Sequence, residues 1–280
     1  MKKLLKKFFS VLLVFSILIG IGLVLYPTIS NLINDVTNKS NFENYDNTVK
    51  TLTSNDTNNL LSKAKEYNRI IASKYFNSSL TEEYKKISNE YENIMDFGEG
   101  IICYIDIHKI NVSLPVYHET VDNVLTKGAA HLKNSSFPLG EKTSHTVISA
   151  HSGFPQQKFF DDLDNLKMGD TFSIRVLTNT YYYKVKSINI VNPNDNSKLK
   201  IIQNKDLVTL VTCYPYSINT HRLLVTGERY IPTQEQKKTL TNYNKIDKFN
   251  ILTCIILLLG YSIIFWKVKT NGRKQIITKT

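Results

Sequence analysis

A histidine, a cysteine and an arginine in the second half of the chain have side chains that together could catalyse acyl transfer. Cys213 ends the apolar segment TLVTC and precedes a proline-containing loop, which places it at the end of a predicted strand. A thiolate is a reactive nucleophile, the imidazole of His151 can transfer protons, and the guanidinium of Arg222 can stabilise an oxyanion. Taken singly, none of them establishes a site, because a cysteine beside a strand is most often buried packing and the chain has 6 histidines.

The segments that would position these side chains are short and rich in β-branched and aromatic residues. Residues 171–177 and 181–191 flank the tripeptide TNT and predict a hairpin. The same composition predicts further strands within residues 102–117, 145–151, 206–213 and 221–230, and residues 159–166 predict a short helix. Seven or eight short strands with few helices predict a mainly β fold, either a closed barrel or a sandwich.

Two amphipathic helices are predicted before the β-rich part. Apolar residues at helical spacing mark one helix over residues 60–71 and another over residues 80–94. Ser79 and Glu82 have the spacing of a capping box at the start of the second helix. The intervening segment SKYFNSS is predicted to be a loop, and two polar stretches are predicted to be linkers, residues 31–59 and 232–248.

The net charge of +11 lies mainly at the two ends of the chain. Residues 1–25 and 249–280 hold nine Lys and Arg and no acidic residue, so the part between them carries only +2. A nearly balanced middle is not the surface of a nucleic-acid-binding protein, and we expect no nucleic-acid partner.

Two uncharged apolar runs adjoin these basic ends. Residues 8–25 and 249–266 each have about 18 residues, the lower limit for a helix that crosses a membrane. Lysines flank the outer end of each run, so the positive-inside rule predicts that both termini are cytoplasmic and that the middle lies outside. A cleaved signal peptide is the alternative for the first run, but no small-residue cleavage site follows it.

The three cysteines do not form a disulfide framework or a metal site. Cys254 lies in the second apolar run and is expected to be a small hydrophobic residue there. The sequence leaves a bridge between Cys103 and Cys213 open. No pair of Cys or His residues has the spacing of metal ligands, and no cofactor is expected.

The segment TLVTCYPYSINTHRLLVTGER closely resembles the active-site signature of the sortases, the membrane-anchored cysteine transpeptidases of Gram-positive bacteria. HTVISAHSGFP resembles the histidine segment of that family, and HLKNSSFPLG resembles its upstream segment. The resemblance covers roughly residues 98–230 and places His151, Cys213 and Arg222 at the catalytic positions. It implies the sortase-type closed eight-stranded β-barrel.

Other features resemble class C, the sortases that assemble pili. They are the PYSINTHRLLVTGER and KFFDDLDNLKMGD segments, the helical extension with AKEYN, and the C-terminal apolar run. Class C enzymes typically have a lid with an Asp-Pro-aromatic motif, whereas this chain has no proline between Pro27 and Pro115. Tyr75 and Phe76 are the aromatic candidates for a lid, and packing between the two helices is an equal alternative for them.

The resemblance and the two apolar runs together imply a two-pass protein of the Gram-positive cell membrane with an extracellular catalytic domain. The expected order along the chain is a basic end (1–7), a transmembrane helix (8–25), a linker and helical extension (26–97), the catalytic barrel (98–231), a linker (232–248), a transmembrane helix (249–266) and a basic tail (267–280).

The resemblance also implies a mechanism and a set of partners. Cys213 would attack an LPxTG-like sorting signal between Thr and Gly and form a thioester, with His151 as the acid and base and Arg222 as a hydrogen-bond donor. The acceptor would be the amine of a pilin lysine or, alternatively, of a peptidoglycan precursor. Thr212 would help to shape the site. His131 matches a histidine common in the class, and a structural hydrogen bond is its expected role.

Three other readings of these residues were weighed. An L,D-transpeptidase usually has its cysteine two residues before an arginine, and a papain-like protease has its cysteine before its histidine, unlike this chain. A non-catalytic surface scaffold with a decayed site remains open. His145 and His221, which flank the motifs, are expected to be solvated and without a role in catalysis.

Overall fold

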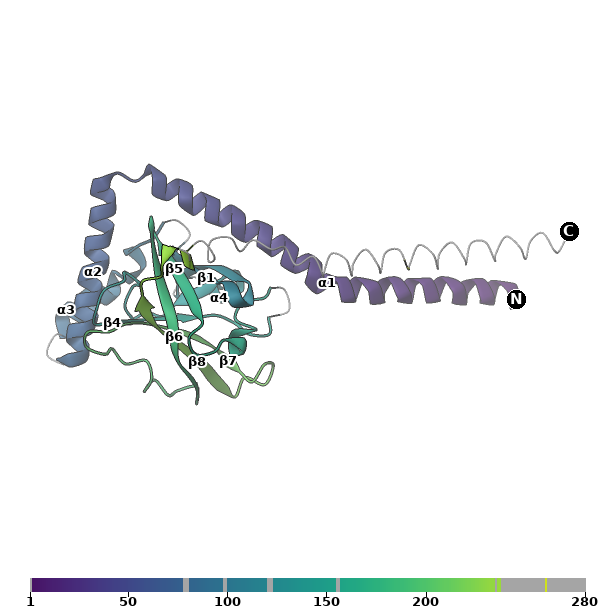
Figure 1. The fold of residues 1–280 in the computed structure, drawn as a ribbon. Coiled ribbons are helices and arrows are strands. Elements are labelled where there is room, and N and C mark those ends of the chain that lie inside the picture. The colour runs from purple at the N-terminus through teal and green to yellow at the C-terminus, as the bar shows by residue number, and fades with distance from the viewer. Residues whose placement is uncertain are drawn as a thin grey trace. The chain divides into compact units, whose positions relative to one another are not determined.

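The computed structural model of the protein describes residues 2–77, 81–97, 100–119, 123–154, 157–234, 236–237 and 260. Its contacts divide the chain into two compact units, Met1–Ile29 with Thr241–Thr280, and Ser30–Leu240. All the strands that the structure describes lie in the second unit (Figure 1). In the described residues, no helix combines the length and the apolar character needed to cross a membrane. The second apolar run lies outside them, apart from Gly260.

Eight strands form a closed barrel. They are β1 (Ile101–Ile107), β2 (Val112–His118), β3 (Ala129–His131), β4 (Ser144–Ser149), β5 (Thr171–Val176), β6 (Asn179–Val191), β7 (Asp206–Tyr214) and β8 (His221–Tyr230). Their order around the barrel is β1-β2-β3-β4-β7-β8-β6-β5, and β5 pairs with β1 to close it. The pairs β2·β3 and β4·β7 are parallel and the other pairs are antiparallel. The prediction of a closed barrel is confirmed, and the sandwich is excluded.

Alternate side chains of β4, β7 and β8 face the barrel core, as the period of two in a strand requires. The inward residues belong to one apolar cluster: Ile148, Val208, Leu210, Leu223 and Val225. Their neighbours Val147, Leu207 and Leu224 are buried but lie outside that cluster, on the opposite face. This outer face of the β4-β7-β8 region matters below, because residues 151, 213 and 222 continue its alternation.

Helices occupy most of the first 90 residues and short turns of helix connect the strands. The α-helices are α1 (Lys2–Thr51), α2 (Ser54–Phe76), α3 (Thr81–Asn89) and α4 (Val124–Lys127), and the 3-10 turns are η1 (Tyr91–Asn93), η2 (His108–Ile110) and η3 (Leu163–Asn165). The two predicted amphipathic helices are confirmed, and the helix predicted over residues 159–166 is reduced to the η3 turn. The prediction that SKYFNSS is a loop was wrong for its first four residues, because α2 extends to Phe76. The second amphipathic helix ends at Asn89 and continues only as the η1 turn.

Residues 31–59, which the sequence predicted to be a linker with little periodicity, are mostly helical, because α1 reaches Thr51 and α2 begins at Ser54. Tertiary contacts stabilise this polar helix where its intrinsic propensity does not. Tyr45 is buried, and its hydroxyl oxygen accepts a hydrogen bond of 2.8 Å from the backbone N–H of Leu177.

The connection between α1 and α2 contains a capping box. Asp56 N–H donates to the Thr53 hydroxyl, and the Asp56 carboxylate accepts the Thr53 N–H. This box was not among the features predicted from the sequence. The one it proposed at Ser79 lies outside the described residues.

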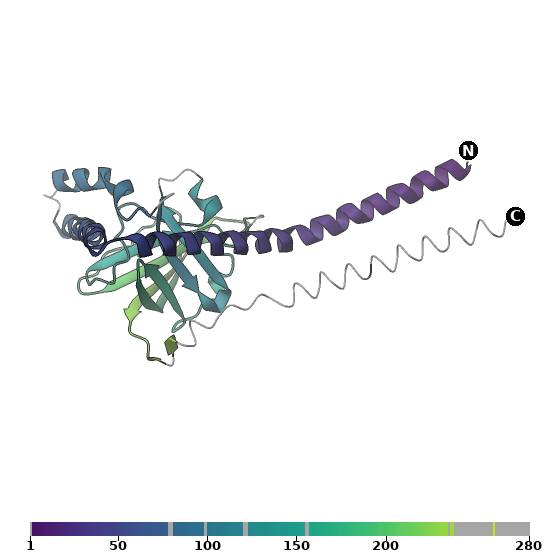
Figure 2. The same ribbon diagram turned by 90° about the horizontal axis from the view of Figure 1, so that it is seen from above.

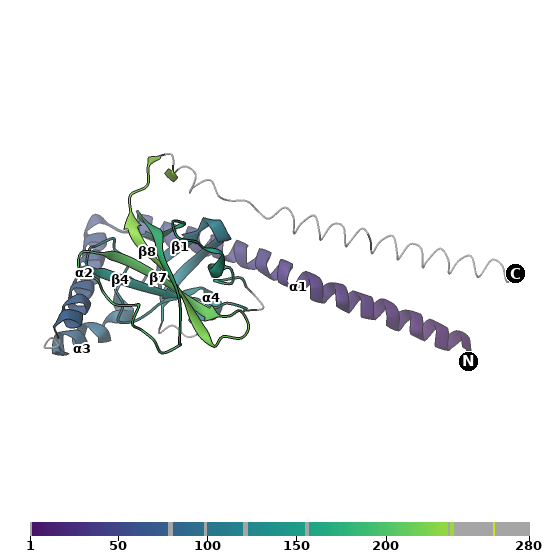
Figure 3. The ribbon, with the colours of Figure 1, turned by 60° about the horizontal axis from the view of Figure 1, so that its bottom comes forward.

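The helices α2 and α3 lie beside each other against one flank of the barrel (Figures 1 and 3). Figure 2, seen from above, looks down the axis of α2. Tyr67 and Ile71 of α2 and Ile87 of α3 are buried in the same cluster as the barrel core. Asn68 adds a two-point contact, because its amide donates to the carbonyl oxygen of Phe137 (2.9 Å) and accepts the N–H of Phe137 (2.7 Å).

Candidate active site

The parallel pairing of β4 with β7 brings His151 beside Cys213. Ser149 is in register with Val211, and the next backbone bond, from Ala150 N–H to Val211 O, measures 3.1 Å. One residue beyond His151, the Ser152 hydroxyl donates to the carbonyl oxygen of Cys213 (3.1 Å). The His151 backbone is therefore about one strand spacing, roughly 4.8 Å, from the end of β7.

The antiparallel pairing of β7 with β8 brings Arg222 opposite Cys213, since the two residues are register partners. Directly opposed side chains on such a ladder have Cβ atoms about 4.5–5.5 Å apart. The Arg222 guanidinium donates to the carbonyl oxygens of Asn219 (3.3 Å) and His221 (3.0 Å), and no carboxylate pairs with it among the described residues. Its remaining N–H groups can therefore donate to a bound group.

Aromatic rings position the His151 side chain. The ring of Phe154 stacks on the imidazole with centroids 5.5 Å apart and planes 6° apart, and Phe159 lies against it at 6.5 Å. Within the part of the chain that the structure describes, neither ring nitrogen makes a hydrogen bond. Both His151 and Cys213 are partly exposed. The imidazole is held in place while its nitrogens stay open for proton transfer.

Asp161 organises the loop that carries those rings. Its carboxylate accepts the N–H of Gly153 (2.9 Å) and the N–H of Phe159 (2.8 Å), and the loop closes where Phe160 N–H donates to His151 O (2.9 Å). Asp161 could not be predicted from the sequence, because a carboxylate that accepts a hydrogen bond from a backbone N–H eight residues away leaves no periodic pattern.

A glycine follows His151 for a conformational reason. Gly153 has a φ of +80°, a backbone conformation that residues with a Cβ rarely adopt. A Cβ built there would lie 3.5 Å from the Tyr216 ring. The His151 loop therefore contacts the connection between β7 and β8.

Thr212 and His131 occupy structural positions. The buried Thr212 hydroxyl donates to Ala150 O (2.8 Å), which links β7 to the residue before His151. His131 is fully buried, and its ring contacts Tyr91 Oη (2.9 Å) and the Ser136 carbonyl oxygen (3.0 Å). Burial lowers the pKa of His131 to about 3, so it is neutral and unsuited to acid catalysis at neutral pH.

The structure does not place Tyr75 and Phe76 over Cys213. Both residues are more than 45% exposed at the end of α2. They line a groove, and the residue of β7 that lines the same groove is Leu207. Leu207 is six residues from Cys213 along the strand, or about 20 Å at 3.3 Å per residue. The two rings contact each other edge to face, and the last two residues of the segment SKYFNSS, Ser78 and Ser79, lie outside the described residues.

The other candidate groups divide into buried and partly exposed ones. The prediction that His145 is solvated was wrong: it is 1% exposed and bonds Lys200 O (2.8 Å) and Thr209 Oγ1 (2.7 Å). His221 is partly exposed and contacts Thr220 Oγ1. Cys103 and Cys213 are both free thiols, so the bridge left open by the sequence is not formed. Among the described residues, no three His, Cys, Asp or Glu side chains gather as metal ligands.

Comparisons with known proteins place this barrel in one family. The family profile described as Sortase domain matches residues 105–230. Sortase D of Bacillus subtilis is 29% identical over 40% of this chain, and the match spans only 54% of that protein's length. Sortase C1 of Streptococcus agalactiae is 38% identical with a TM-score of 0.61, covering 68% of this chain and 97% of that one.

A second solved neighbour is sortase C of Clostridium perfringens SM101, which is 36% identical with a TM-score of 0.58. That comparison covers 69% of this chain and 99% of the other. The profile, the identity and the shared eight-stranded barrel agree with one another. The chain therefore belongs to the sortase family of cysteine transpeptidases, and its solved structural neighbours are class C sortases.

Proposed function

We propose that the protein is a transpeptidase in which Cys213 attacks the carbonyl carbon between Thr and Gly of an LPxTG-like sorting signal. The carbon–nitrogen bond breaks, the amine departs, and the acyl group remains on Cys213 as a thioester. An incoming amine then attacks the thioester, the carbon–sulfur bond breaks, and the thiolate is regenerated. The observation that carries this proposal is the convergence of His151, Cys213 and Arg222 at one end of the β4-β7-β8 face.

The roles of His151 and Arg222 follow from their surroundings. The open nitrogens of His151 can protonate the departing amine and then take a proton from the incoming one. The N–H groups of Arg222 that do not bond carbonyl oxygens can donate to the substrate or to the oxyanion that forms on its carbonyl. No metal or cofactor enters either step.

We propose that the acceptor is the lysine amine of a pilin, so that the product is an isopeptide bond between pilus subunits. The class C neighbours support this choice. The sortase C of Clostridium perfringens was also solved with the C-terminal cell wall sorting motif. The amine of a peptidoglycan precursor is the second candidate, and a product analysis with both amines separates the two.

We also propose that the protein is held in the cell membrane of a Gram-positive bacterium by residues 8–25 and 249–266, with the barrel outside. The support is in the sequence: two uncharged apolar runs with lysines at their outer ends. Protease digestion of intact cells tests this topology, because an extracellular barrel is cut while basic tails in the cytoplasm are protected.

The catalytic proposal is tested with the full chain, an LPxTG-type peptide and a lysine-bearing pilin domain. Mass spectrometry is expected to find the acyl group on Cys213 and an isopeptide-linked product. Cys213→Ala is expected to lose at least about 10³-fold in rate, and Arg222→Ala about 10²-fold or more. Unchanged turnover by Cys213→Ala would overturn the proposal, and a folded wild-type chain without any thioester would favour the decayed scaffold.

A further inference from the structure

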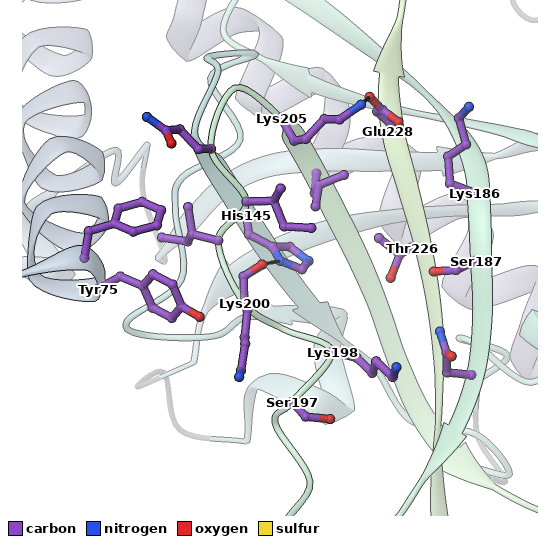
Figure 4. A pocket seen from close by; sticks show the side chains of 16 residues that line it. Tyr75, His145, Lys186, Ser187, Ser197, Lys198, Lys200, Lys205, Thr226 and Glu228 are labelled. Atoms are coloured by element: carbon purple, nitrogen blue, oxygen red, sulfur yellow. Dashed lines mark hydrogen bonds and ion pairs between the residues drawn. The ribbon is translucent and has the colours of Figure 1, made fainter.

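A groove of about 660 Å³ opens on the outside of the barrel and has no part in the chemistry described above (Figure 4). The end of α2 forms one wall, where Tyr75 faces the groove. The connection between β6 and β7 crosses it, and residues of β4, β6, β7 and β8 supply the floor. Thr226 and His145 at the floor belong to a buried chain of hydrogen bonds through Thr209, which makes that part of the groove rigid.

The groove is strongly basic. Four exposed lysines line it, Lys186, Lys198, Lys200 and Lys205, against the single carboxylate of Glu228. Glu228 forms an ion pair with Lys205 (Figure 4). Lys186 and Lys200 have no carboxylate partner among the described residues. Three lysines whose charge Glu228 does not neutralise would favour a ligand with negative charges.

The groove is also apolar in part. Tyr75 and Phe76 are 46% and 56% exposed, and Ile202 on the crossing connection is 52% exposed. Hydroxyl and amide groups of Ser187 and Asn189 on β6 complete the lining. A polyphosphate-like polymer would leave this apolar surface wet, whereas a polypeptide with acidic and aliphatic side chains covers both kinds of surface.

The groove shares a face with the catalytic side chains. Leu207 of its floor and Cys213 are an even number of residues apart on β7, as are Thr226 and Arg222 on β8, so all four point to the outer face. Asn189 is in register with Leu224, two residues from Arg222. One end of the groove therefore lies near Arg222 and its register partners on β6 and β7.

The lysines lie further along the same direction. Lys186 lies on β6 opposite Thr226 and Gly227 of β8. The carbonyl oxygen of Lys200 is hydrogen-bonded to His145, and His145 is in register with Leu207 of β7. These rows of register partners are four to six residues from the row of Cys213, or about 13–20 Å. An extended peptide covers that distance with four to six residues.

We propose that the groove binds an acidic, partly aliphatic segment of the donor polypeptide, four to six residues on the N-terminal side of the carbonyl that Cys213 attacks. This inference rests on the proposed function. The N-terminal side of the donor stays on the enzyme in the thioester after the leaving group departs. A contact with this segment would therefore act in both half-reactions, which a contact with the leaving group would not.

The test compares three peptides that share one sorting motif. The first has Asp and Glu four to six residues before the attacked carbonyl, the second has Asn and Gln there, and the third has the acids on the leaving-group side. Binding to full-length Cys213→Ala is measured by fluorescence anisotropy, so the readout does not depend on turnover. Inorganic polyphosphate is included as the probe for the other polyanion class.

The acidic upstream peptide is expected to bind the Cys213→Ala chain about 10-fold more tightly than the amide peptide, and higher salt should reduce the difference. Introducing Lys186→Glu and Lys200→Glu into the Cys213→Ala chain is expected to abolish its preference for the acidic peptide over the amide peptide. Lys63→Glu with Lys127→Glu is the matched control, since both lysines are exposed and lie outside the groove, and it should retain the preference.

Equal binding of the first two peptides, tighter binding of the third, or a preference that survives the Lys186 and Lys200 changes would overturn the inference. Tight binding of polyphosphate without an acidic-peptide preference would overturn it as well. A short motif peptide without upstream residues separates the two proposals. If the wild-type chain forms the thioester on Cys213 with this short peptide while the first two peptides bind alike, the groove inference fails and the catalytic proposal stands.

Discussion

Among the single residues of the site, each side chain has a chemical role that depends on the residues packed around it. Cys213 is a partly exposed thiol at a strand end because β7 continues past the core, and His151 lies beside it because β4 runs parallel to β7. No carboxylate orients the imidazole among the described residues, and the Phe154 ring does so by stacking. Asp161 is the residue that holds this arrangement through the backbone of the loop.

We expect Asp161→Ala to lower kcat about 10-fold with little change in KM. The substitution leaves the N–H groups of Gly153 and Phe159 without their acceptor, so the loop that orients the imidazole loosens. Steady-state kinetics with a saturating motif peptide measures the effect. Asp161→Asn keeps one acceptor oxygen and should recover part of the rate.

The matched control for this prediction is Asp164→Asn, an exposed carboxylate on the adjacent η3 turn. It should leave kcat within about twofold of the wild type. A positioning role also predicts a changed pH profile of kcat in Asp161→Ala, because the imidazole samples new surroundings. A variant with reduced stability, normal kcat and a normal pH profile would show that Asp161 is only structural.

At the scale of elements, the helical extension is part of the barrel's packing. Tyr67 of α2 contacts Tyr91 and Phe137 ring to ring, and Tyr91 in turn bonds the His131 carbonyl oxygen (2.7 Å). Tyr45 of α1 joins the same buried cluster. The extension therefore contributes to the core of the catalytic unit, while its exposed end at Phe76 forms a wall of the basic groove.

We expect Asn68→Ala to lower the free energy of unfolding by about 2–4 kcal/mol, because it leaves a buried N–H and a buried carbonyl of Phe137 unpaired. Chemical denaturation of the full chain measures this. Asn59→Ala, on an exposed position of the same helix, should change the stability by no more than about 0.5 kcal/mol. Equal stability of the two variants would mean that α2 is not clamped to the barrel through Asn68.

At the scale of the whole molecule, one buried carboxylate joins three strands. Asp206 at the start of β7 is 6% exposed and accepts hydrogen bonds from Ser144 Oγ and Tyr183 Oη, both 3.3 Å away. Burial raises its pKa from 3.8 to about 6, although Arg229 at 3.7 Å opposes that rise. As the pH rises, Asp206 in the folded protein therefore keeps its proton to a higher pH than Asp206 in the unfolded chain does.

This linkage gives a stability term with a definite sign. The stabilisation from the Asp206 proton is fully present below pH 3.8, where Asp206 is protonated in both the folded and the unfolded protein. It is lost as the pH rises through about 6. We expect the wild type to lose about 3 kcal/mol relative to Asp206→Asn between these limits. Denaturant unfolding of both proteins at several pH values measures the difference, and other titrating groups cancel in it.

The exposed Asp162, paired with Lys158, is the control for this titration. The difference between the wild type and Asp162→Asn should stay within about 0.5 kcal/mol over the same range. A wild-type stability that rises relative to Asp206→Asn as the pH increases would contradict the raised pKa of Asp206.

The local features of this protein can be predicted from its amino-acid sequence alone. Segments rich in β-branched and aromatic residues predicted six strand regions, and helical spacing predicted α2 and α3. The resemblance to sortase motifs implied His151, Cys213 and Arg222. These features could be predicted because each depends on residues close together in the chain. β3, with three residues, was too short for alternation to reveal.

The contacts between distant segments become visible only in the folded chain. Folding closed the barrel through β1 and β5, extended α1 to Thr51 by burying Tyr45, and buried His145. It also placed Asp161 behind the histidine loop, and Tyr75 in a basic groove away from Cys213. The physical reason is that burial and hydrogen bonding between residues far apart in the chain produce no periodicity and no local composition that can be recognised in one sequence.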